Sequence, residues 1–484
     1  MSETIDRRYK RIRPALDAIG QAHVLAFWKE LSEEQKLRLL DDLEQIDIGA
    51  LPELGRLATQ TQQRRTTWDS FAPAPVIPRE SVGGEIVERG RSLLTSGKVA
   101  ALTVAGGQGT RLGFDGPKGA LPISPVKNKS LFQLFAESIL ASQRRYKNNE
   151  PIAWYIMTSP ANDRATQSFF RTHRFFGLAP GQVHFFQQGV MPALDREGRL
   201  LLRERHRLAL SPDGHGGCLL ALAKSGMLAD MAGRGIELVS YFQVDNPLVA
   251  CLDPAFIGLH DERGSEMSSK TLPKADDLER VGNFLLADGR LTVIEYIDFV
   301  HLPDEVVHGR TETGSRKYDA ANAAIHLLSR SFLERITAGA AGFALPWHVA
   351  AKKVPHIDLN TGRRNEPDAT NGIKLEAFIF DALPLAANPI LMGTSRAEEF
   401  SPVKNKTGVD SVETARLDMS RRAARWLEQA GVKVPRDEHG EPTAFYEISP
   451  MVALDAEEFK ECQRTGEANT LQPTPTSRGV YLGT

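Results

Sequence analysis

One stretch of this 484-residue chain limits its possible folds more than any other: VAALTVAGGQGTRLGFDGPKGALPI, residues 99–123. Its first part, Val99 to Val104, is a short apolar run typical of a strand buried on both faces. Glycines begin where that run ends, and they let backbone N–H groups approach phosphate oxygens without Cβ interference. The loop carries four close glycines and two cations: Gly106, Gly107, Gly109, Gly113, Arg111 and Lys118. We therefore expect a phosphate-binding loop at the end of a central strand.

The glycine spacing excludes two familiar phosphate-binding motifs. Gly107, Gly109 and Gly113 leave one residue too many for the dinucleotide pattern G-x-G-x-x-G, and no Gly-Lys-Ser/Thr follows, as a P-loop requires. The glycines alone also allow a tight strand-to-helix turn without ligand, because such turns are common in α/β proteins.

Apolar runs alternate with helical patterns from about residue 86 to 385, which predicts an α/β fold with a mostly parallel sheet. Ligands bind beyond the carboxyl ends of the strands in such sheets, so loops starting at Ala105, Gln188 and Asp245 should converge on one crevice. The candidate strands are Val99–Val104, Ile152–Thr158, Val183–Gln187 and Leu238–Val244.

The chain is longer than one core usually supports, so we expect several domains. Their predicted limits are 1–80 (helical arm and connector), 81–388 (catalytic α/β domain) and 389–484 (small α+β subdomain). Ser32 with Gln35 predicts a capping box in the arm, and 61–78 reads as an extended connector. We expect one amphipathic helix over 410–430, short strand-like pieces from Val434 onward, and a loosely held, turn-rich tail, QPTPTSRGVYLGT.

Composition limits the possible partners and compartments. With 59 basic against 61 acidic side chains, no global field favours nucleic acid or anionic lipid. The three cysteines are far apart and form no CxxC pattern, which fits a reducing compartment. The N-terminus lacks the apolar core of a signal peptide, and no run of about 20 apolar residues occurs. We predict a cytoplasmic protein without membrane contact; the oligomeric state stays open.

Eight blocks in order resemble the UDP-sugar pyrophosphorylase family, and most closely the eukaryotic-type UDP-N-acetylhexosamine enzymes. They begin at Ala105 (AGGQGTRLG…GPKG), Phe185 (FFQQGVMPAL), Ser211 (SPDGHGG), Tyr241 (YFQVDNPLV), Val293 (VIEYIDF), Leu345 (LPWHVAAKKVPHID), Asn371 (NGIKLEAFIFD) and Glu398 (EEFSPVKN). The resemblance implies a mixed, mostly parallel Rossmann-like nucleotidyltransferase sheet. It also implies UTP and a hexose 1-phosphate as substrates, UDP-sugar and pyrophosphate as products, and Mg²⁺ as cofactor.

The resemblance assigns a role to each matching residue. Asp245 would bind the metal; without the resemblance, an Asp-Asn pair after a strand is more often a helix cap or Asx-turn. Gly106, Gly107, Arg111 and Lys118 would hold the pyrophosphate. The other implied contacts are Gln188 and Gly214 with the uracil ring, Gly282, Glu295 and Asn322 with the sugar, and Lys374 and Lys404 with the phosphates. His215 is a further substrate-binding position, and it bears on the choice of sugar.

Three departures from the family pattern concern the sugar. His215 stands where the N-acetylhexosamine enzymes commonly have asparagine, Ile297 where they have serine, and Ala321 where they usually have glycine. The order of the blocks and the retained Asn322 and Glu295 favour uridylyl transfer to N-acetylglucosamine 1-phosphate, which is the predicted reaction. The three departures could fit glucose 1-phosphate, so glucose 1-phosphate or a broad set of sugars is the alternative. A non-catalytic UDP-sugar-binding protein is a third hypothesis, because a fold alone does not fix a function.

Overall fold

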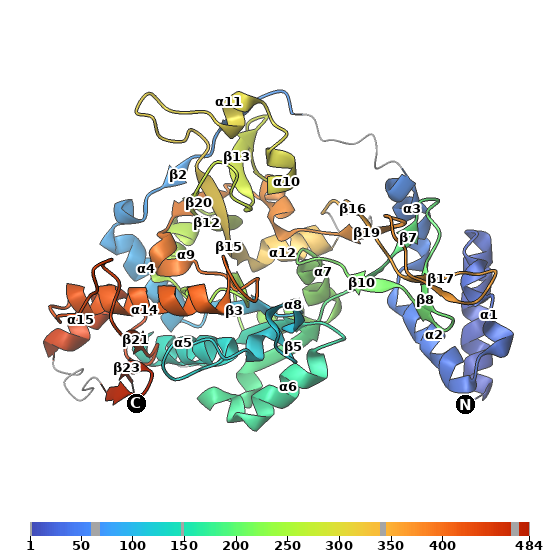
Figure 1. Ribbon diagram of the computed structural model, residues 1–484, viewed down its shortest axis with the longest axis horizontal. Helices are drawn as coiled ribbons and strands as arrows, with labels where there is room; N and C mark the ends of the chain where they lie inside the picture. Colours follow the sequence, from blue (N-terminus) through green and yellow to red (C-terminus); the bar gives the residue numbers. More distant parts are fainter. Residues whose placement is uncertain (1, 60–67, 147–149, 339–344, 466–473, 484) are drawn as a thin grey trace. The chain divides into compact units, whose positions relative to one another are not determined.

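The computed structural model describes residues 2–59, 68–146, 150–338, 345–465 and 474–483 (Figure 1). They form two compact units, each described here by itself. The large unit contains Asp69–Gln187, Leu222–Phe343 and Ala382–Thr484, and the small unit contains Met1–Trp68, Gln188–Ala221 and Ala344–Asp381. The predicted domain limits at residues 80 and 388 stay a prediction. Among the described residues, no helix is long and apolar enough to cross a membrane.

An 11-stranded sheet forms the centre of the large unit, and Figure 1 labels several of its strands, among them β3, β5, β12, β15 and β20. Strands β11, β3, β4 and β5 are parallel neighbours, whereas β15 is antiparallel to both β11 and β12. The order is β2 (Val76–Ile77), β20 (Ile390–Gly393), β12 (Met267–Pro273), β15 (Ala320–Ser329), β11 (Leu238–Gln243), β3 (Val99–Val104), β4 (Trp154–Thr158) and β5 (Val183–Gln187). The mixed, mostly parallel α/β sheet is confirmed, and all four predicted strands lie in it.

Helices pack on this sheet and close its core. The helices are α4 (Gly84–Thr95), α5 (Leu131–Tyr146), α6 (Asp163–Thr172), α8 (Met227–Gly233), α9 (Pro254–Glu262), α10 (Tyr296–Phe299), α11 (Asp304–Val307), α12 (Arg330–Thr337) and α13 (Arg396–Glu399). Fully buried Phe132 and Phe135 of α5, Trp154 of β4 and Phe242 of β11 belong to one apolar core. The β3 strand is buried along its length because its residues are apolar on both faces.

The connector after the N-terminal helices takes part in the sheet. As predicted, residues 71–77 are extended, but they do more than link. Strand β1 (Phe71–Pro73) pairs with β13 (Asn283–Ala287), which also pairs with β14 (Arg290–Ile294), and β2 pairs with β20. Residues 60–67 of the predicted connector lie outside the described residues.

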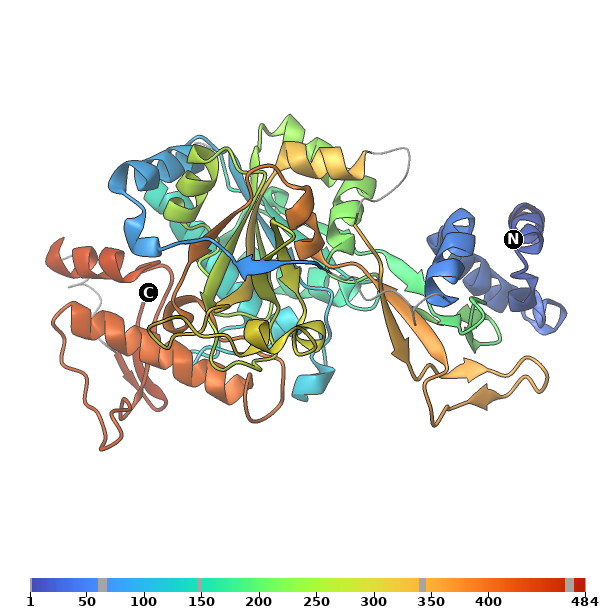
Figure 2. The ribbon, with the colours of Figure 1, turned by 90° about the horizontal axis from the view of Figure 1, so that it is seen from above.

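The C-terminal segment of the large unit is a small α+β subdomain, as predicted. It contains α14 (Val412–Gln429), α15 (Ala456–Thr465), β21 (Phe445–Ile448), β22 (Thr474–Thr476) and β23 (Gly479–Leu482). In Figure 2 these orange and red elements gather at one end of the unit. The expectation of a loosely held tail is wrong for its end: β23 pairs with β21, Tyr481 and Leu482 are buried, and Leu482 belongs to the subdomain's core.

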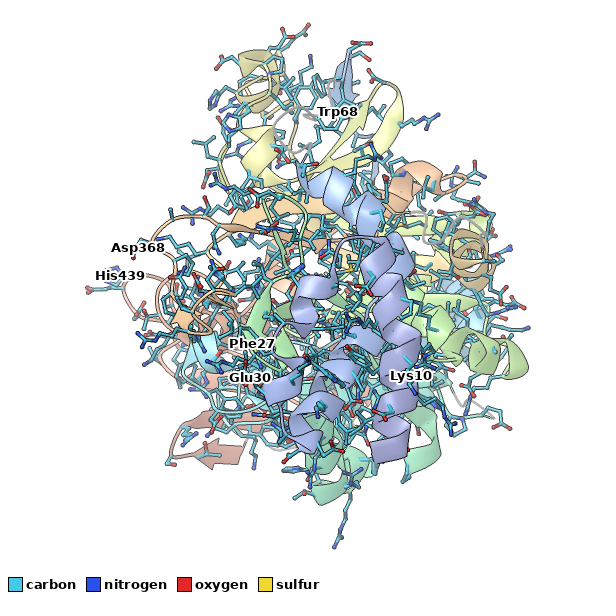
Figure 3. The ribbon with its side chains drawn as sticks, turned by 90° about the vertical axis from the view of Figure 1, so that its right-hand side faces the viewer. Lys10, Phe27, Glu30, Trp68, Asp368 and His439 are labelled. Atoms are coloured by element: carbon cyan, nitrogen blue, oxygen red, sulfur yellow. The ribbon has the colours of Figure 1, made fainter. Side chains whose placement is uncertain are left out.

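The small unit joins N-terminal helices to short sheets. Its elements are α1 (Ser2–Ala18), α2 (Glu33–Gln45), α3 (Leu51–Thr59), β6 (Val190–Pro192), β7 (Leu194–Asp195), β8 (Leu202–Glu204), β9 (Arg207–Leu208), β10 (Leu210–Pro212), β16 (His348–Lys352), β17 (His356–Ile357), β18 (Arg364–Asn365), β19 (Gly372–Glu376) and the first half of α7 (Gly217–Lys224). The capping box of Ser32 and Gln35 is confirmed at α2. Figure 3 shows Phe27 and Glu30 close together on this helical layer, where Arg205 contacts both.

Candidate active site

The glycine-rich loop, residues 105–118, presents unpaired backbone donors at the carboxyl end of β3. Within the described part of the chain, the N–H groups of Gly106, Gly107 and Gln108 have no hydrogen-bond partner. Backbone carbonyl groups in this part of the loop are hydrogen-bonded instead, and these hydrogen bonds hold the loop in place. The Asn162 amide donates to the carbonyl oxygens of Ala105 and Gly107, at 2.8 and 3.1 Å. Because the carbonyls are fixed, the free N–H groups are preorganised to receive an anion.

Lys118 and Asp245 lie beside this loop. The Lys118 N–H donates to the Gly107 carbonyl at 3.1 Å, and the Lys118 Nζ is 3.3 Å from the Asp245 Oδ2. Both side chains are mostly buried, with 17% and 13% exposure. Arg111 lies on the short 3-10 turn Thr110–Leu112 and is exposed; no ion pair to it is found among the described residues. The loop thus brings two cations, Arg111 and Lys118, to the end of the sheet, where Lys118 meets the Asp245 carboxylate.

The Lys404 segment, residues 399–410, is joined to Asp245 through the backbone. The Val403 N–H donates to the Asp245 carbonyl at 2.9 Å, and the Lys404 N–H donates to the Asp410 carbonyl at 2.7 Å. Burial raises the pKa of the Asp410 carboxyl, the Lys404 charge lowers it, and the Asp245 charge raises it further. The Lys404 side chain itself is exposed. Lys404 therefore starts from a buried, hydrogen-bonded backbone and reaches outward.

The residues present fit a hard cation that takes one ligand from the protein and its other ligands from phosphate and water. Among the described residues, no group of three or more His, Cys, Asp or Glu side chains could hold a metal by itself. Mg²⁺ needs only one or two protein carboxylates when phosphate oxygens are present. Asp245 supplies one such carboxylate next to the free N–H groups of the glycine-rich loop.

The three residues implied for the sugar come together where β13 begins, β14 ends and β15 begins: Gly282 precedes β13, Glu295 follows β14, and Asn322 lies in β15. The Asn322 N–H donates to the Gly282 carbonyl at 2.8 Å. A Cβ on Gly282 would lie 2.7 Å from the Val293 Cγ1 and 3.2 Å from the Glu295 Oε1, so only glycine leaves this space. β15 is antiparallel to β11, so the start of β15, where Asn322 lies, is at the carboxyl end of β11, which Asp245 follows. The sugar residues therefore lie at the sheet edge that carries Asp245.

The Asn322 side chain is oriented by its own strand. Its amide oxygen accepts the Ala324 N–H at 2.8 Å, and Ala324 has a φ of 55°, in the left-handed region that alanine rarely adopts. This hydrogen bond occupies the oxygen and turns the amide NH₂ group away from Ala324. Asn322 is thus set to act as a hydrogen-bond donor.

The small unit holds the other four predicted residues: Gln188, Gly214, His215 and Lys374. Gly214 has a φ of 86°, and a Cβ there would lie 2.4 Å from the Ala377 carbonyl oxygen, so this turn requires glycine twice over. Lys374 and Glu376 share one face of β19, and the Glu376 Cβ packs at Gly214. Gln188 is buried, with 8% exposure.

His215 lies within an aromatic cluster that sequence reasoning missed. Its ring stacks on Phe378, with centroids 5.2 Å apart, and lies 5.7 Å from the ring of Phe380. Its Nδ1 accepts the Ile379 N–H at 3.2 Å, which places the ring proton on Nε2. The block NGIKLEAFIFD carries both phenylalanines, so their alternation around Ile379 was the available signal.

Comparison with known proteins decides the family. The family described as UTP–glucose-1-phosphate uridylyltransferase matches residues 55–473. The chain belongs to this uridylyltransferase family. UDP-N-acetylglucosamine diphosphorylase 1 of Arabidopsis thaliana is 36% identical, over 91% of this chain and 88% of the relative. UDP-N-acetylhexosamine pyrophosphorylase-like protein 1 of Homo sapiens is also 36% identical, over 92% and 93%.

A solved structure extends the similarity to the fold of this uridylyltransferase. The uridine diphosphate N-acetylglucosamine pyrophosphorylase from Trypanosoma brucei, in complex with an inhibitor, superposes with a TM-score of 0.82 and 27% identity. The match covers 99% of this chain and 98% of that chain. The predicted family, fold class and enzyme class are confirmed: this is a nucleotidyltransferase of the UDP-sugar pyrophosphorylase type.

Proposed function

We propose that this uridylyltransferase forms UDP-N-acetylglucosamine and pyrophosphate from UTP and N-acetylglucosamine 1-phosphate, with Mg²⁺ as cofactor. One observation carries the proposal: free N–H groups of Gly106 and Gly107 lie beside Lys118, Asp245 and the Lys404 segment at one end of the sheet. That arrangement combines anion donors, fixed positive charge and a metal-binding carboxylate, which is what transfer between phosphates requires.

In the proposed reaction an oxygen of the sugar phosphate attacks the α-phosphorus of UTP. A new P–O bond forms to the sugar phosphate, the bond to the bridging oxygen breaks, and pyrophosphate leaves with the electron pair. The second pKa of a phosphate monoester is about 6, so the nucleophile is already ionised at neutral pH. No general base is needed, and the chain contributes position and charge.

Each cluster then has a distinct task. The glycine-rich loop with Arg111 and Lys118 would hold the leaving pyrophosphate, and Lys404 would neutralise charge at the α-phosphate. Lys374 would meet the sugar phosphate. Mg²⁺, when held by Asp245 and phosphate oxygens, supplies Lewis-acid neutralisation of the triphosphate.

The base and the sugar are assigned to the remaining residues. The Gln188 amide offers both a donor and an acceptor to the uracil edge, next to the backbone of Gly214. Asn322 supports the N-acetyl sugar, because its NH₂ group can donate to an acetamido carbonyl while Ala324 occupies its oxygen. Glu295 would accept hydrogen bonds from sugar hydroxyls.

A pyrophosphate-release assay tests reaction class and substrate together. The purified chain receives UTP, Mg²⁺ and either N-acetylglucosamine 1-phosphate or glucose 1-phosphate. We expect faster release with the N-acetyl sugar. Faster release with glucose 1-phosphate would indicate the alternative that His215, Ile297 and Ala321 suggest. No release with any hexose 1-phosphate, together with tight UDP-sugar binding, would favour a non-catalytic binder. A cytoplasmic location stays a prediction that cell fractionation can test.

A further inference from the structure

Two chain segments must be held together for the proposed site to exist. One is the Asp245 loop, residues 245–249, which follows β11. The other is the Lys404 segment, which reaches the same edge from β20 through α13. They are more than 150 residues apart in the sequence, yet the Val403 N–H donates to the Asp245 carbonyl. Since Lys404 is exposed, its placement depends on how the backbone before it is anchored.

Asn246, the residue after Asp245, joins these two segments with its side chain. Its amide NH₂ donates to the Glu399 carbonyl at 2.7 Å. Its amide oxygen accepts two N–H groups, one from Ser401 at 3.1 Å and one from Leu248 at 3.2 Å. The side chain is buried, with 5% exposure. Donor and acceptor are thus both used, on both segments, away from water.

A buried ion cluster fixes the start of the Lys404 segment. Lys270 of β12 is fully buried, and its Nζ lies 2.7 Å from the Asp253 Oδ2 and 2.6 Å from the Glu399 Oε2. The Thr394 hydroxyl donates to the Glu399 Oε1 at 2.8 Å. Moving Glu399 would leave a buried charge unpaired, which costs several kcal/mol. The carbonyl that receives the Asn246 amide is therefore anchored to the sheet.

A second link comes from α14. The Arg422 Nη1 donates to the Leu248 carbonyl at 2.9 Å and to the Glu398 carbonyl at 3.0 Å. One guanidinium thus joins Leu248 of the Asp245 loop to Glu398, the residue immediately before the Lys404 segment. The shared boundary of the segments is tied at three points.

We propose that Asn246 is a positioning residue for uridylyl transfer: its side-chain hydrogen bonds hold the Lys404 segment against the Asp245 loop. The ion pair of Lys270 with Glu399 in turn fixes the start of the Lys404 segment. Asn246 touches no substrate in this account and acts through the placement of Lys404. The inference rests on the role proposed for Lys404 above. Misplacing a charge by about 1 Å can cost about 100-fold in rate, so a side chain away from the reacting atoms can control turnover.

A double-mutant cycle with Asn246→Ala and Lys404→Ala tests this. Asn246→Ala should lower kcat by about 10- to 100-fold and change KM for UTP by less than about 3-fold. In the Lys404→Ala background the same change should cost less than about 2-fold, because nothing remains to be positioned. An equal loss in both backgrounds overturns the proposal. So does a folded Asn246→Ala variant whose kcat stays within about 2-fold of wild type.

Gln182→Ala is the matched control. Gln182 is buried, with 3% exposure, and its amide also makes three hydrogen bonds: it accepts the Ala179 N–H and donates to Gln143 and the Ile152 carbonyl. It lies at the amino end of β5, away from the carboxyl ends of the strands. We expect a comparable fall in the melting midpoint with kcat within about 2-fold of wild type. An equal kcat loss would mean that general destabilisation explains the Asn246 result, and the proposal would fail.

Two further measurements keep the outcomes separate. If Asn246→Ala does not fold, Asn246→Asp carries the same kinetic test, since it keeps the acceptor for Ser401 and Leu248 but cannot donate to Glu399. Hydrogen exchange should then show faster exchange of the Val403 N–H alone among the sheet-edge amides; unchanged protection there contradicts the proposal. Wild-type turnover of the single variant Lys404→Ala would instead contradict the proposed function, whatever Asn246 does.

Discussion

At the scale of single residues, the charged and hydrogen-bonding groups around the glycine-rich loop satisfy one another only in part. Lys118 lies 3.3 Å from Asp245, yet the loop beside them keeps free N–H groups. A triphosphate with a divalent cation would satisfy all three kinds of group at once. Each residue in this set should therefore affect a different part of the reaction.

Asp245→Asn should lower turnover by about 100-fold or more, because the amide is isosteric but removes the charge that would hold Mg²⁺. A steady-state pyrophosphate-release assay across Mg²⁺ concentrations checks it. Asp115→Asn, at an exposed carboxylate of the same loop, should keep the wild-type rate. Near wild-type turnover of Asp245→Asn would show that the metal assignment is wrong.

Lys118→Ala should weaken UTP and pyrophosphate by about 10-fold while UDP-sugar binding changes less, since only the first two ligands carry the pyrophosphate group. Calorimetric titration with each ligand gives the comparison. Lys98→Ala, at the amino end of β3 where Lys98 pairs with Glu237, is the control. Equal losses for all three ligands would indicate a structural role instead.

Asn322→Ala should lower kcat/KM for N-acetylglucosamine 1-phosphate by about 10-fold, the scale of one hydrogen bond to the acetamido group, and change glucose 1-phosphate less. The two substrates are compared in the same assay at fixed UTP. If wild type prefers glucose 1-phosphate and the variant loses equally on both, the N-acetyl assignment is incorrect.

The role of a residue could be predicted from the sequence where neighbouring residues in the chain form the site together. Gly106, Gly107 and Lys118 announce a phosphate loop, and the structure gives them free N–H groups and a partner in Asp245. Asn246 could not be identified, because its three hydrogen bonds reach residues 2 and more than 150 positions away. The stacking of His215 on Phe378 was equally invisible, since it depends on a turn of the chain and not on spacing.

At the scale of elements, helices α4 and α9 cross unusually closely. A Cβ on Gly90 would lie 1.8 Å from the Pro254 carbonyl oxygen, and one on Gly258 would lie 1.8 Å from the Ile86 carbonyl oxygen. Both opposing atoms belong to the backbone, so neither helix can yield without moving as a whole. The close crossing therefore requires glycine at both positions, because any larger side chain would meet the backbone of the other helix.

Gly90→Ala tests this crossing. Alanine favours a helix by about 1 kcal/mol over glycine, but separating two packed helices costs about 1–3 kcal/mol or more, so the net effect should be destabilising. Denaturant unfolding measures it. Gly84→Ala, in the same helix with no atom within 4 Å of the new Cβ, should be neutral or slightly stabilising. A Gly90→Ala variant as stable as Gly84→Ala would contradict the close crossing.

Elements with a strong local pattern were predictable, and those that depend on distant partners were not. Strand β3 occupies the predicted residues 99–104 because its run is apolar except for Thr103, and α14 lies within the predicted 410–430. By contrast, β1 and β2 are strands only because β13 and β20 pair with them. The pairing of β23 with β21 likewise orders a turn-rich tail whose composition favoured looseness.

At the scale of the whole molecule, stability should fall toward acid partly through one buried histidine. His260 of α9 is almost fully buried, bonded to Ser268 and Ser329, and burial lowers its pKa to about 4, although Asp261 opposes this. The unfolded chain protonates this group near pH 6.5, before the folded chain does. Its contribution is therefore present above pH 6.5 and is lost as the pH falls toward 4.

His260→Gln should remove this histidine's part of the loss of stability at low pH. Each pKa unit is worth about 1.4 kcal/mol, so the wild type should lose about 3 kcal/mol between pH 7 and 4 through this group, and the variant should not. Denaturant midpoints of both proteins at pH 7 and pH 4.5 give the comparison. Parallel pH dependence of the two proteins would show that other groups, such as Asp253, dominate the acid response.

The small unit is assembled from three distant stretches of sequence, and its core packs Leu39 and Leu43 with Leu194 and Leu375. Sequence read in chain order gives no sign of such an assembly. At about 5–20 residues per second, the roughly 330 residues between Leu43 and Leu375 take about 17–66 s to synthesise. A nascent chain therefore carries an apolar helical layer without its last partners for most of translation, and the emergence of residues 344–381 decides when that layer is fully protected from aggregation.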